Sequence, residues 1–319
     1  MKNTTKRLFV LVTLVILIGL VAVYFLFPGI AFHVLQKAER SAAGLEQHSI
    51  EVNGLHMEYL EGGRGDVLVL LHGFGANKDN WTRIGKYLTP HFRVIAPDLP
   101  GSGQSGADPE GDYTIGTQAE RVKAFVGALG IRSFHLGGNS MGGFIAGVYA
   151  ARYPEDLKSL LLLAPAGVAS AEPSELFRLL KEGKPNPLVV KSVEEYERLL
   201  DFVFVKRPFI PRPIKKFFIR EAIRHRPINL EIGKDLEKSF KELHLEELLK
   251  GQRTPTFIVW GDKDRVLHVS GAKILESVMP KAKAHVMDDV GHVPMLERPE
   301  QTARLYVNFL EGKMPNSGD

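Results

Sequence analysis

The sequence predicts an α/β fold in which a mostly parallel sheet is covered by helices on both faces. It also predicts a helical lid inserted into this fold and one transmembrane helix before it. Three observations support these predictions. Short apolar runs alternate with helical stretches through most of the chain. The alternation stops over residues 168–251 and resumes at Thr256, as it would around an inserted helical segment. An uncharged run of 20 residues, Leu8 to Phe27, precedes the whole pattern.

These observations divide the 319 residues into segments. We expect a tail and transmembrane anchor at residues 1–28, a juxtamembrane linker at 29–48, the α/β core at 49–167 and 252–312, a lid or cap at 168–251, and a C-terminal tail at 313–319. The chain has no cysteine, which excludes thiol nucleophiles, disulfides and cysteine-ligated zinc. Its net charge of +4 is too small to indicate a nucleic-acid partner, and none is expected.

The run from Leu8 to Phe27 predicts one membrane crossing. A helix rises about 1.5 Å per residue, so a run of this length spans about 30 Å of hydrocarbon. A cleaved signal peptide is the alternative, but its apolar region has only about 7 to 15 residues, with a small-residue cleavage site close behind. More basic residues precede the run than follow it, namely Lys2, Lys6 and Arg7 against Lys37 and Arg40. The positive-inside rule therefore predicts a cytoplasmic N-terminus and a folded domain on the outer, periplasmic or extracytoplasmic, side.

A β-hairpin is expected to open the folded domain from Ser49, because Asn53-Gly54 between two alternating runs is a hairpin-turn signal. Before it, Ile30 to Arg40 has apolar residues at helical spacing, which fits either an interfacial helix or a plain spacer. Buried strands are then expected at residues 67–71, 93–96, 134–136, 160–163, 256–260 and 284–287. In such a sheet, active-site residues lie at the carboxyl ends of strands.

Gly138-Asn139-Ser140-Met141-Gly142 is a G-x-S-x-G pentapeptide between a predicted strand and a helical run that starts at Gly143. A serine nucleophile on a tight strand-to-helix turn needs small neighbours, because the turn brings adjacent backbone close. A glycine-rich turn without chemistry is the alternative for the pentapeptide alone. The strand before it and the helix after it favour Ser140 as a nucleophile.

A serine hydroxyl needs a base to remove its proton and a carboxylate to orient that base. His292 follows the last predicted strand and is the candidate base, with His268 as its rival. Two aspartates, Asp262 and Asp264, follow the strand that ends at Trp260. We select Asp264 because it lies further into the loop, where its side chain can reach the histidine of the neighbouring strand. The three selected residues then occur along the chain in the order Ser, Asp, His, which is the order found in α/β-hydrolases.

The developing oxyanion needs donors, and glycines around Phe74 let backbone N–H groups face the site. We assign the oxyanion hole to the backbone N–H groups of Phe74 and Met141. His72 is interpreted as a structural imidazole that holds this loop.

Residues 101–106 match G-x-G-x-x-G, but no helix is expected there, and pyrophosphate binding needs a helix N-terminus. No metal or nucleotide motif appears elsewhere, so we expect neither cofactor nor metal.

These motifs resemble the successive signatures of the α/β-hydrolase superfamily over about residues 49–311. They are His72-Gly73-Phe74-Gly75, residues 98–103, the Ser140 turn, residues 261–264 and Gly291-His292. The resemblance implies the α/β-hydrolase fold, Ser140, Asp264 and His292 as a catalytic triad, and a lid over an acyl pocket. Residues 138–143 with 147–150 are similar to membrane-anchored monoacylglycerol lipases and related bacterial lipases and esterases.

That resemblance implies a serine hydrolase of lipid carboxylic esters, such as monoacylglycerol or another acylglycerol, which acts through an acyl-enzyme on Ser140. Hydrolases that cleave a carbon-carbon bond of vinylogous diketones carry a similar serine turn and are one alternative. Val293-Pro294 after His292 resembles lipases instead. A non-catalytic receptor on the same fold is a second alternative, against which the retention of all three triad residues argues.

The positive charge is concentrated in the predicted lid. Residues 206–226 contain eight basic side chains and one acid, Glu221, interleaved with apolar and aromatic residues. This pattern suits an anionic membrane surface, with apolar side chains dipping into the headgroups. A cap helix whose phenylalanines roof the pocket and whose charges are solvated explains it equally well, and both can hold together.

Overall fold

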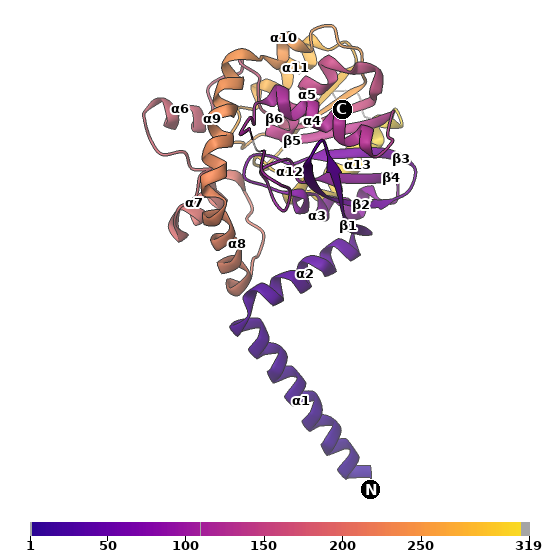
Figure 1. The fold of residues 1–319 in the computed structure, drawn as a ribbon, viewed down its shortest axis with the longest axis vertical. Coiled ribbons are helices and arrows are strands. Elements are labelled where there is room, and N and C mark those ends of the chain that lie inside the picture. The colour runs from indigo at the N-terminus through magenta and orange to yellow at the C-terminus, as the bar shows by residue number, and fades with distance from the viewer. Residues whose placement is uncertain (1, 109, 314–319) are drawn as a thin grey trace.

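One eight-stranded sheet organises the folded domain (Figure 1). The computed structural model describes residues 2–108 and 110–313, although the side chains of residues 2–4, 16, 17 and 20–23 lie outside the described set. The strand order is β1-β2-β4-β3-β5-β6-β7-β8, in which β2 runs antiparallel to both of its neighbours and the six strands from β4 to β8 are parallel. The strands are β1 (Leu45–Val52), β2 (Leu55–Gly63), β3 (Asp66–Leu71), β4 (Phe92–Pro97), β5 (Phe134–Ser140), β6 (Leu157–Pro165), β7 (Thr256–Gly261) and β8 (Ala282–Met287).

The hairpin at Asn53-Gly54 is confirmed. Both residues have positive φ, at 51° and 80°, as the mirror-image turns of two-residue hairpins require. The first strand begins at Leu45, four residues before the predicted Ser49, because Leu45 already pairs with Gly62. All six predicted strands are present, but β8 at the edge of the sheet is only partly buried, with Val286 44% exposed.

Helices cover both faces of the sheet, as predicted. Alternation along β3 sends Val69 and Leu71 into one hydrophobic cluster and Leu68 and Leu70 into another on the opposite face. The first cluster includes residues of α4 (Ile115–Ala128), α5 (Met141–Arg152) and α11 (Ser270–Val278). The second includes residues of η1 (Lys78–Trp81), α3 (Thr82–Leu88), α12 (Pro294–Glu297) and α13 (Pro299–Leu310). A short 3-10 turn, η2 (Pro154–Asp156), leads into β6.

A helical insertion separates β6 from β7. Residues 166–255 are all described and contain no strand, in agreement with the break in the sequence pattern. Their helices are α6 (Glu175–Lys181), α7 (Val193–Val203), α8 (Arg212–Arg224), α9 (Arg226–Glu242) and α10 (Leu245–Leu248). Figure 1 shows α6 to α9 together on one side of the sheet domain.

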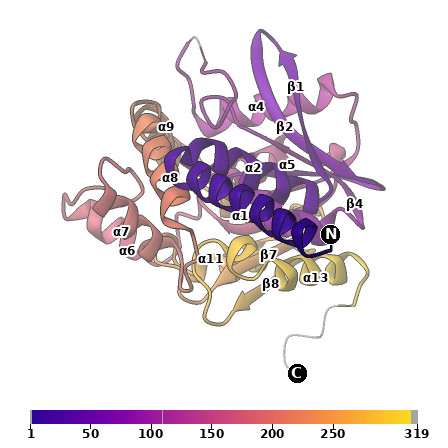
Figure 2. The same ribbon diagram turned by 90° about the horizontal axis from the view of Figure 1, so that it is seen from below.

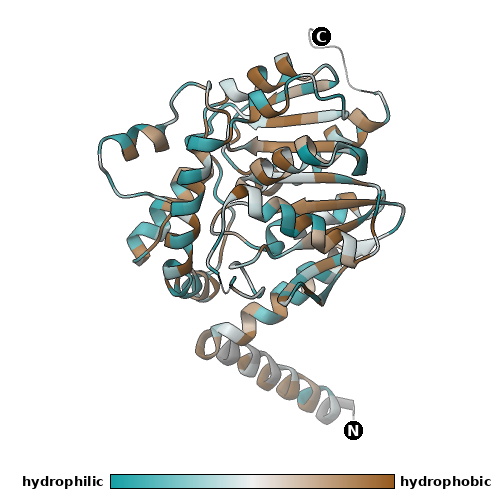
Figure 3. Ribbon diagram, turned by 45° about the horizontal axis from the view of Figure 1, so that its top comes forward, coloured by the Kyte–Doolittle hydropathy of each residue, from teal (hydrophilic) through white to brown (hydrophobic). Residues whose placement is uncertain are grey.

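Two helices precede the sheet, α1 (Lys2–Leu26) and α2 (Pro28–Ala42). Figure 1 shows α1 projecting away from the domain, and Figure 3 colours its described apolar residues brown. Among the described residues, no helix combines the length and apolarity needed to cross a membrane. The predicted crossing from Leu8 to Phe27 includes the six positions 16, 17 and 20–23 whose side chains are not described, and it is not confirmed. The stretch from Ile30 to Arg40 is helical throughout, within α2.

Candidate active site

Ser140 lies at the junction of β5 and α5 in a conformation that non-glycine residues rarely adopt. Its φ is 56° and its ψ is −118°. The glycines two residues to either side are required by close backbone approach. A Cβ at Gly138 would lie 2.2 Å from the carbonyl oxygen of Gly142, and a Cβ at Gly142 would lie 2.1 Å from that of Leu71. The pentapeptide is therefore a sharp strand-to-helix turn, as its sequence context predicts.

Asp264 and His292 come together from the loops after β7 and β8. The imidazole Nδ1 of His292 lies 2.8 Å from Oδ2 of Asp264, and both side chains are buried, with 6% and 0% of their surface exposed. A neutral imidazole that donates from Nδ1 keeps Nε2 as an acceptor, which is the tautomer a general base needs. The residue before Ser140 links this pair to the turn, because Nδ2 of Asn139 donates to the carbonyl oxygen of His292 at 3.1 Å.

The Asp264 carboxylate is held by further donors. Its Oδ1 accepts hydrogen bonds from the backbone N–H groups of Val266 at 2.8 Å and Leu267 at 3.0 Å. Its Oδ2 accepts a second hydrogen bond from the indole Nε1 of Trp260 at 3.1 Å. Sequence reasoning did not identify Trp260 or Asn139 as support for the site, although Asn139 directly precedes Ser140 and Trp260 lies four residues before Asp264. These bonds leave the carboxylate with one orientation, directed at His292.

The rival residues have other partners. Nζ of Lys263 lies 2.6 Å from Oδ2 of Asp262, whose Oδ1 accepts from the backbone of Val290. Burial raises the pKa of the Asp262 carboxyl, but the hydrogen bonds from Lys263 and Val290 outweigh it and hold this pKa below its usual value. His268 shares a hydrogen bond with the hydroxyl of Ser270 at 2.9 Å. Neither Asp262 nor His268 contributes to the pair formed by Asp264 and His292.

The loop after β3 passes directly beside Ser140. A Cβ added at Gly73 would lie 3.2 Å from the Cβ of Ser140, which brings the neighbouring Phe74 to the turn. His72 is fully buried, donates from Nδ1 to the carbonyl oxygen of Gly73 at 2.9 Å and accepts at Nε2 from the backbone of Leu99 at 3.0 Å. Burial lowers the pKa of His72, which keeps it neutral. It holds the loop, as expected.

Two further segments border this loop. A Cβ at Gly75 would lie 3.7 Å from Nδ2 of Asn229, and one at Gly233 would lie 3.8 Å from the ring of Phe74. Helix α9 of the insertion therefore lies over the loop.

The glycine-rich residues 101–106 open no helix, because the next helix among the described residues, α4, begins only at Ile115. They do not form the helix N-terminus that dinucleotide binding requires.

A cavity of about 620 Å³ lies at the opposite edge of the sheet, near the start of β3, β5 and β6. It has a second group of Asp, His and Ser, because Asp66 and His135 line it and His135 bonds Ser159 at 2.8 Å. Ser159 is fully buried, and its Oγ also lies 2.8 Å from the hydroxyl of Tyr306. Because Ser159 is closed to substrate, this group is structural.

Comparison with known proteins shows the family of this chain. The family model described as "alpha/beta hydrolase fold" matches residues 66–299. Lipase 1 of Psychrobacter immobilis is 38% identical over 85% of this chain and 86% of its own. A monoacylglycerol lipase of Homo sapiens is 32% identical over 92% of this chain and 90% of its own.

Solved structures agree as well. The crystal structure of a membrane phospholipase A, described as a bacterial virulence factor, is 43% identical to this chain. It superimposes with a TM-score of 0.87 and covers 97% of this chain and 99% of its own. The chain therefore belongs to the α/β-hydrolase fold family and is a carboxylic ester hydrolase of the lipase and esterase type.

Proposed function

We propose that this enzyme hydrolyses acyl esters of lipids through an acyl-enzyme on Ser140, with His292 as general base and Asp264 as the carboxylate that orients it. The observation that carries the proposal is the 2.8 Å hydrogen bond between Asp264 and His292, which lies beside a strained serine turn. A buried carboxylate that holds imidazole in one tautomer is the arrangement that activates a serine hydroxyl.

In the first half-reaction, Nε2 of His292 takes the hydroxyl proton of Ser140 while Oγ attacks the ester carbonyl carbon. The backbone N–H groups of Phe74 and Met141 stabilise the oxyanion of the tetrahedral intermediate. Collapse breaks the bond to the alcohol, which leaves with the proton from His292. Water then attacks the acyl-enzyme, with His292 again as base, and releases the fatty acid and free Ser140.

Acylglycerols are the proposed substrate class. The similar lipases and monoacylglycerol lipase support a glyceryl ester, and the similar phospholipase A extends the class to glycerophospholipids. Some solved structures with the same fold are meta-cleavage product hydrolases, such as one that is 25% identical with a TM-score of 0.73. Because their identity to this chain is lower than that of the lipases, we favour an ester over a carbon-carbon bond as the bond that this enzyme cleaves.

The N-terminal segment, residues 1–28, is proposed to attach the enzyme to a membrane, with the N-terminus cytoplasmic and the domain on the outer side. Exposed apolar side chains on α1, such as Phe9 at 74% and Val10 at 64%, support attachment. The helical insertion is proposed as the lid, and its basic segment 206–226 as a second membrane contact. Phe209, which is 89% exposed between Arg207 and Arg212, supports this contact.

A substrate panel tests the reaction class. The full-length enzyme is expected to cleave monoacylglycerols and glycerophospholipids much faster than a vinylogous diketone. Negligible ester hydrolysis with rapid diketone cleavage would identify a carbon-carbon hydrolase instead. Absence of both activities and of fluorophosphonate labelling would favour a non-catalytic receptor.

Orientation is testable because the chain has no cysteine of its own. Single cysteines at Asn3→Cys and Lys184→Cys can be treated with a membrane-impermeant maleimide in intact cells. Only Lys184→Cys is expected to react. If only the Asn3→Cys variant reacted, the N-terminus would lie outside and the proposed orientation would be wrong. Detachment of the enzyme from anionic vesicles at high salt, after removal of residues 1–28, would support the basic lid contact.

A further inference from the structure

Helix α2 contacts two parts of the catalytic domain with one face. Phe32, Gln36 and Arg40 are spaced four residues apart, so they lie along one side of the helix. Ile30 and Val34 lie on the opposite side, where they are 54% and 62% exposed. Since α2 begins two residues after α1 ends, whatever holds α1 also holds this helix.

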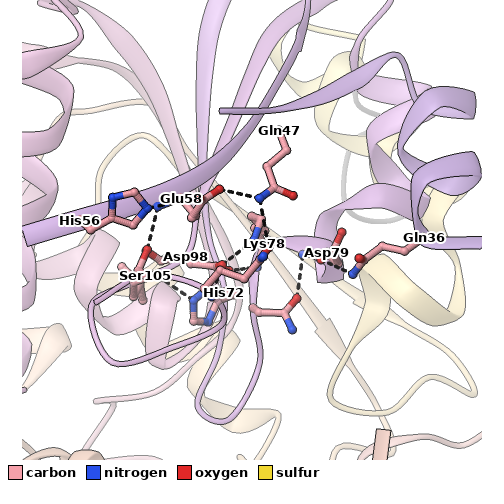
Figure 4. Close-up of polar contacts among 12 residues, drawn as sticks. Gln36, Gln47, His56, Glu58, His72, Lys78, Asp79, Asp98 and Ser105 are labelled. Atoms are coloured by element: carbon pink, nitrogen blue, oxygen red, sulfur yellow. Dashed lines mark hydrogen bonds and ion pairs between the residues drawn. The ribbon is translucent and has the colours of Figure 1, made fainter. Parts of the chain in front are cut away.

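The C-terminal half of α2 is bonded to Asp79. Nε of Arg40 lies 2.6 Å from Oδ1 of Asp79, and its second nitrogen, Nη2, lies 2.7 Å from Oδ2. Nε2 of Gln36 donates to the same Oδ2 at 2.8 Å, a contact that Figure 4 shows. The Arg40 side chain is only 11% exposed, so this bidentate pair is partly withdrawn from solvent. Asp79 belongs to η1, which ends the loop that contains Phe74.

That loop is fixed at both ends. Lys78, the neighbour of Asp79, forms a fully buried ion pair with Asp98, whose Oδ2 lies 2.6 Å from the Lys78 Nζ. Leu99, the neighbour of Asp98, donates to His72 at 3.0 Å, and His72 precedes Gly73 and the proposed oxyanion donor. A short series of polar contacts and adjacent residues therefore leads from α2 to both ends of the oxyanion loop.

The N-terminal half of α2 packs on the lid instead. The ring of Phe32 stacks on that of Phe217 with centroids 4.2 Å apart and planes 22° apart. It meets the ring of Phe218 edge-on at 5.2 Å. Both partners belong to α8, and Figure 2 shows α8 beside α2. Stacked and edge-on aromatic pairs stabilise a contact beyond the area they bury.

We propose that α2 is a brace that positions the lid helix α8 and the oxyanion loop relative to each other. Arg40 is a positioning residue for the loop that holds Phe74, and Phe32 is a positioning residue for the lid. The inference rests on the proposed function, since it needs Phe74 to donate to an oxyanion.

The loop half is tested with full-length enzyme in detergent micelles and p-nitrophenyl butyrate, with active sites counted by fluorophosphonate titration. Arg40→Ala and Asp79→Ala are each expected to lower kcat per active site about tenfold and to change KM less than about twofold, because a displaced oxyanion donor weakens transition-state binding. The double variant is expected to be no slower than the slower of the two single variants, because both changes remove the same Arg40–Asp79 pair, although Arg40 also contacts Gln47 and Asp79 also contacts Gln36. Arg40→Lys should be intermediate, because it keeps the charge without the bidentate geometry.

Glu39→Ala is the matched control, because Glu39 is exposed on the same helix and its side chain has no polar contact with another described residue. The Glu39→Ala enzyme should match the parent enzyme in kcat per active site, in KM and in the number of titratable sites. A merely structural role of Arg40 would reduce the number of titratable sites and leave kcat per site unchanged. That result would overturn the loop half of the brace. Failure of the parent enzyme to label would contradict Ser140 as nucleophile instead.

The lid half is tested by hydrogen exchange. Phe32→Ala is expected to speed amide exchange in α8 about fivefold or more, while α4 on the sheet keeps its protection. The Glu39→Ala enzyme should exchange like the parent in both helices. Unchanged exchange in α8 would show that Phe32 does not position the lid and would overturn this half.

Discussion

The side chain of Asp264 is fully buried and bonded to the imidazole of His292, whereas that of Asp262, two residues earlier, is 25% exposed and pairs with a lysine. The two aspartates of this loop therefore have different surroundings, and we propose that only Asp264 orients His292. Asp264→Asn is expected to lower kcat about 10⁴-fold, because an amide cannot hold the required tautomer of His292. Asp262→Asn is expected to change kcat only a few-fold. Steady-state kinetics of both variants test this expectation. Equal losses of kcat would contradict the assignment of Asp264 as the residue that orients His292.

The serine turn needs glycine at position 142. A Cβ there would meet the backbone carbonyl oxygens of Leu71 at 2.1 Å and His72 at 2.5 Å. Gly142→Ala is therefore expected to lower the free energy of unfolding by about 2–3 kcal/mol, as overpacking does. Gly127→Ala in α4 is the matched control, because nothing lies within 4 Å of its added Cβ. It should raise the free energy of unfolding by about 0.5–1 kcal/mol in a urea titration. No loss for Gly142→Ala would show that the turn is less closely packed.

The buried ion pair of Lys78 and Asp98 stabilises the fold as a pair. Lys78→Met leaves the Asp98 carboxyl buried without its cation, and the free energy of unfolding is expected to fall by about 3–5 kcal/mol. Lys241, which pairs with Glu237 on the surface of α9, is the control, since both side chains are more than 70% exposed. Lys241→Met should leave the unfolding curve unchanged, because exposed pairs contribute little. Similar curves for both variants would contradict this account of the pair.

Stability is expected to fall in mild acid because His72 is buried and neutral. Burial lowers its pKa in the folded protein, while the unfolded imidazole binds a proton below about pH 6.5. The stabilisation is thus present above that pH and is lost as the pH falls, by at most about 1.4 kcal/mol per pH unit for one such residue. Burial also lowers the pKa of His135 and His285, which add to the slope. Urea titrations between pH 7.5 and 5.5 should show a shallower slope for His72→Gln, and an equal slope would contradict this origin.

Much of the candidate site was predictable from the sequence, because the positions of its residues depend on strand order and local turns. Ser140, Asp264 and His292 each follow a predicted strand of one parallel sheet, and the carboxyl ends of such strands meet at one edge. The choice of Asp264 over Asp262 followed from its greater distance into the loop. The strands themselves were recognisable from apolar runs bounded by polar turns.

The remaining contacts depend on tertiary packing, which no local pattern encodes. Trp260 supports Asp264 only because the loop folds back under its own strand. Helix α2 was one of two readings of an amphipathic stretch, and its partners Asp79 and Phe217 lie 39 and 185 residues from Arg40 and Phe32. The extension of β1 to Leu45 likewise depends on its pairing with Gly62.

The central claim is that Ser140 is the nucleophile, and covalent labelling tests it most directly. Full-length enzyme is treated with a fluorophosphonate, digested and mapped by mass spectrometry, beside the variant Ser140→Ala. The account predicts one adduct, on Ser140, and no adduct and a loss of turnover by several orders of magnitude in the folded variant. An adduct on another serine, or labelling and hydrolysis that persist in Ser140→Ala, would contradict it.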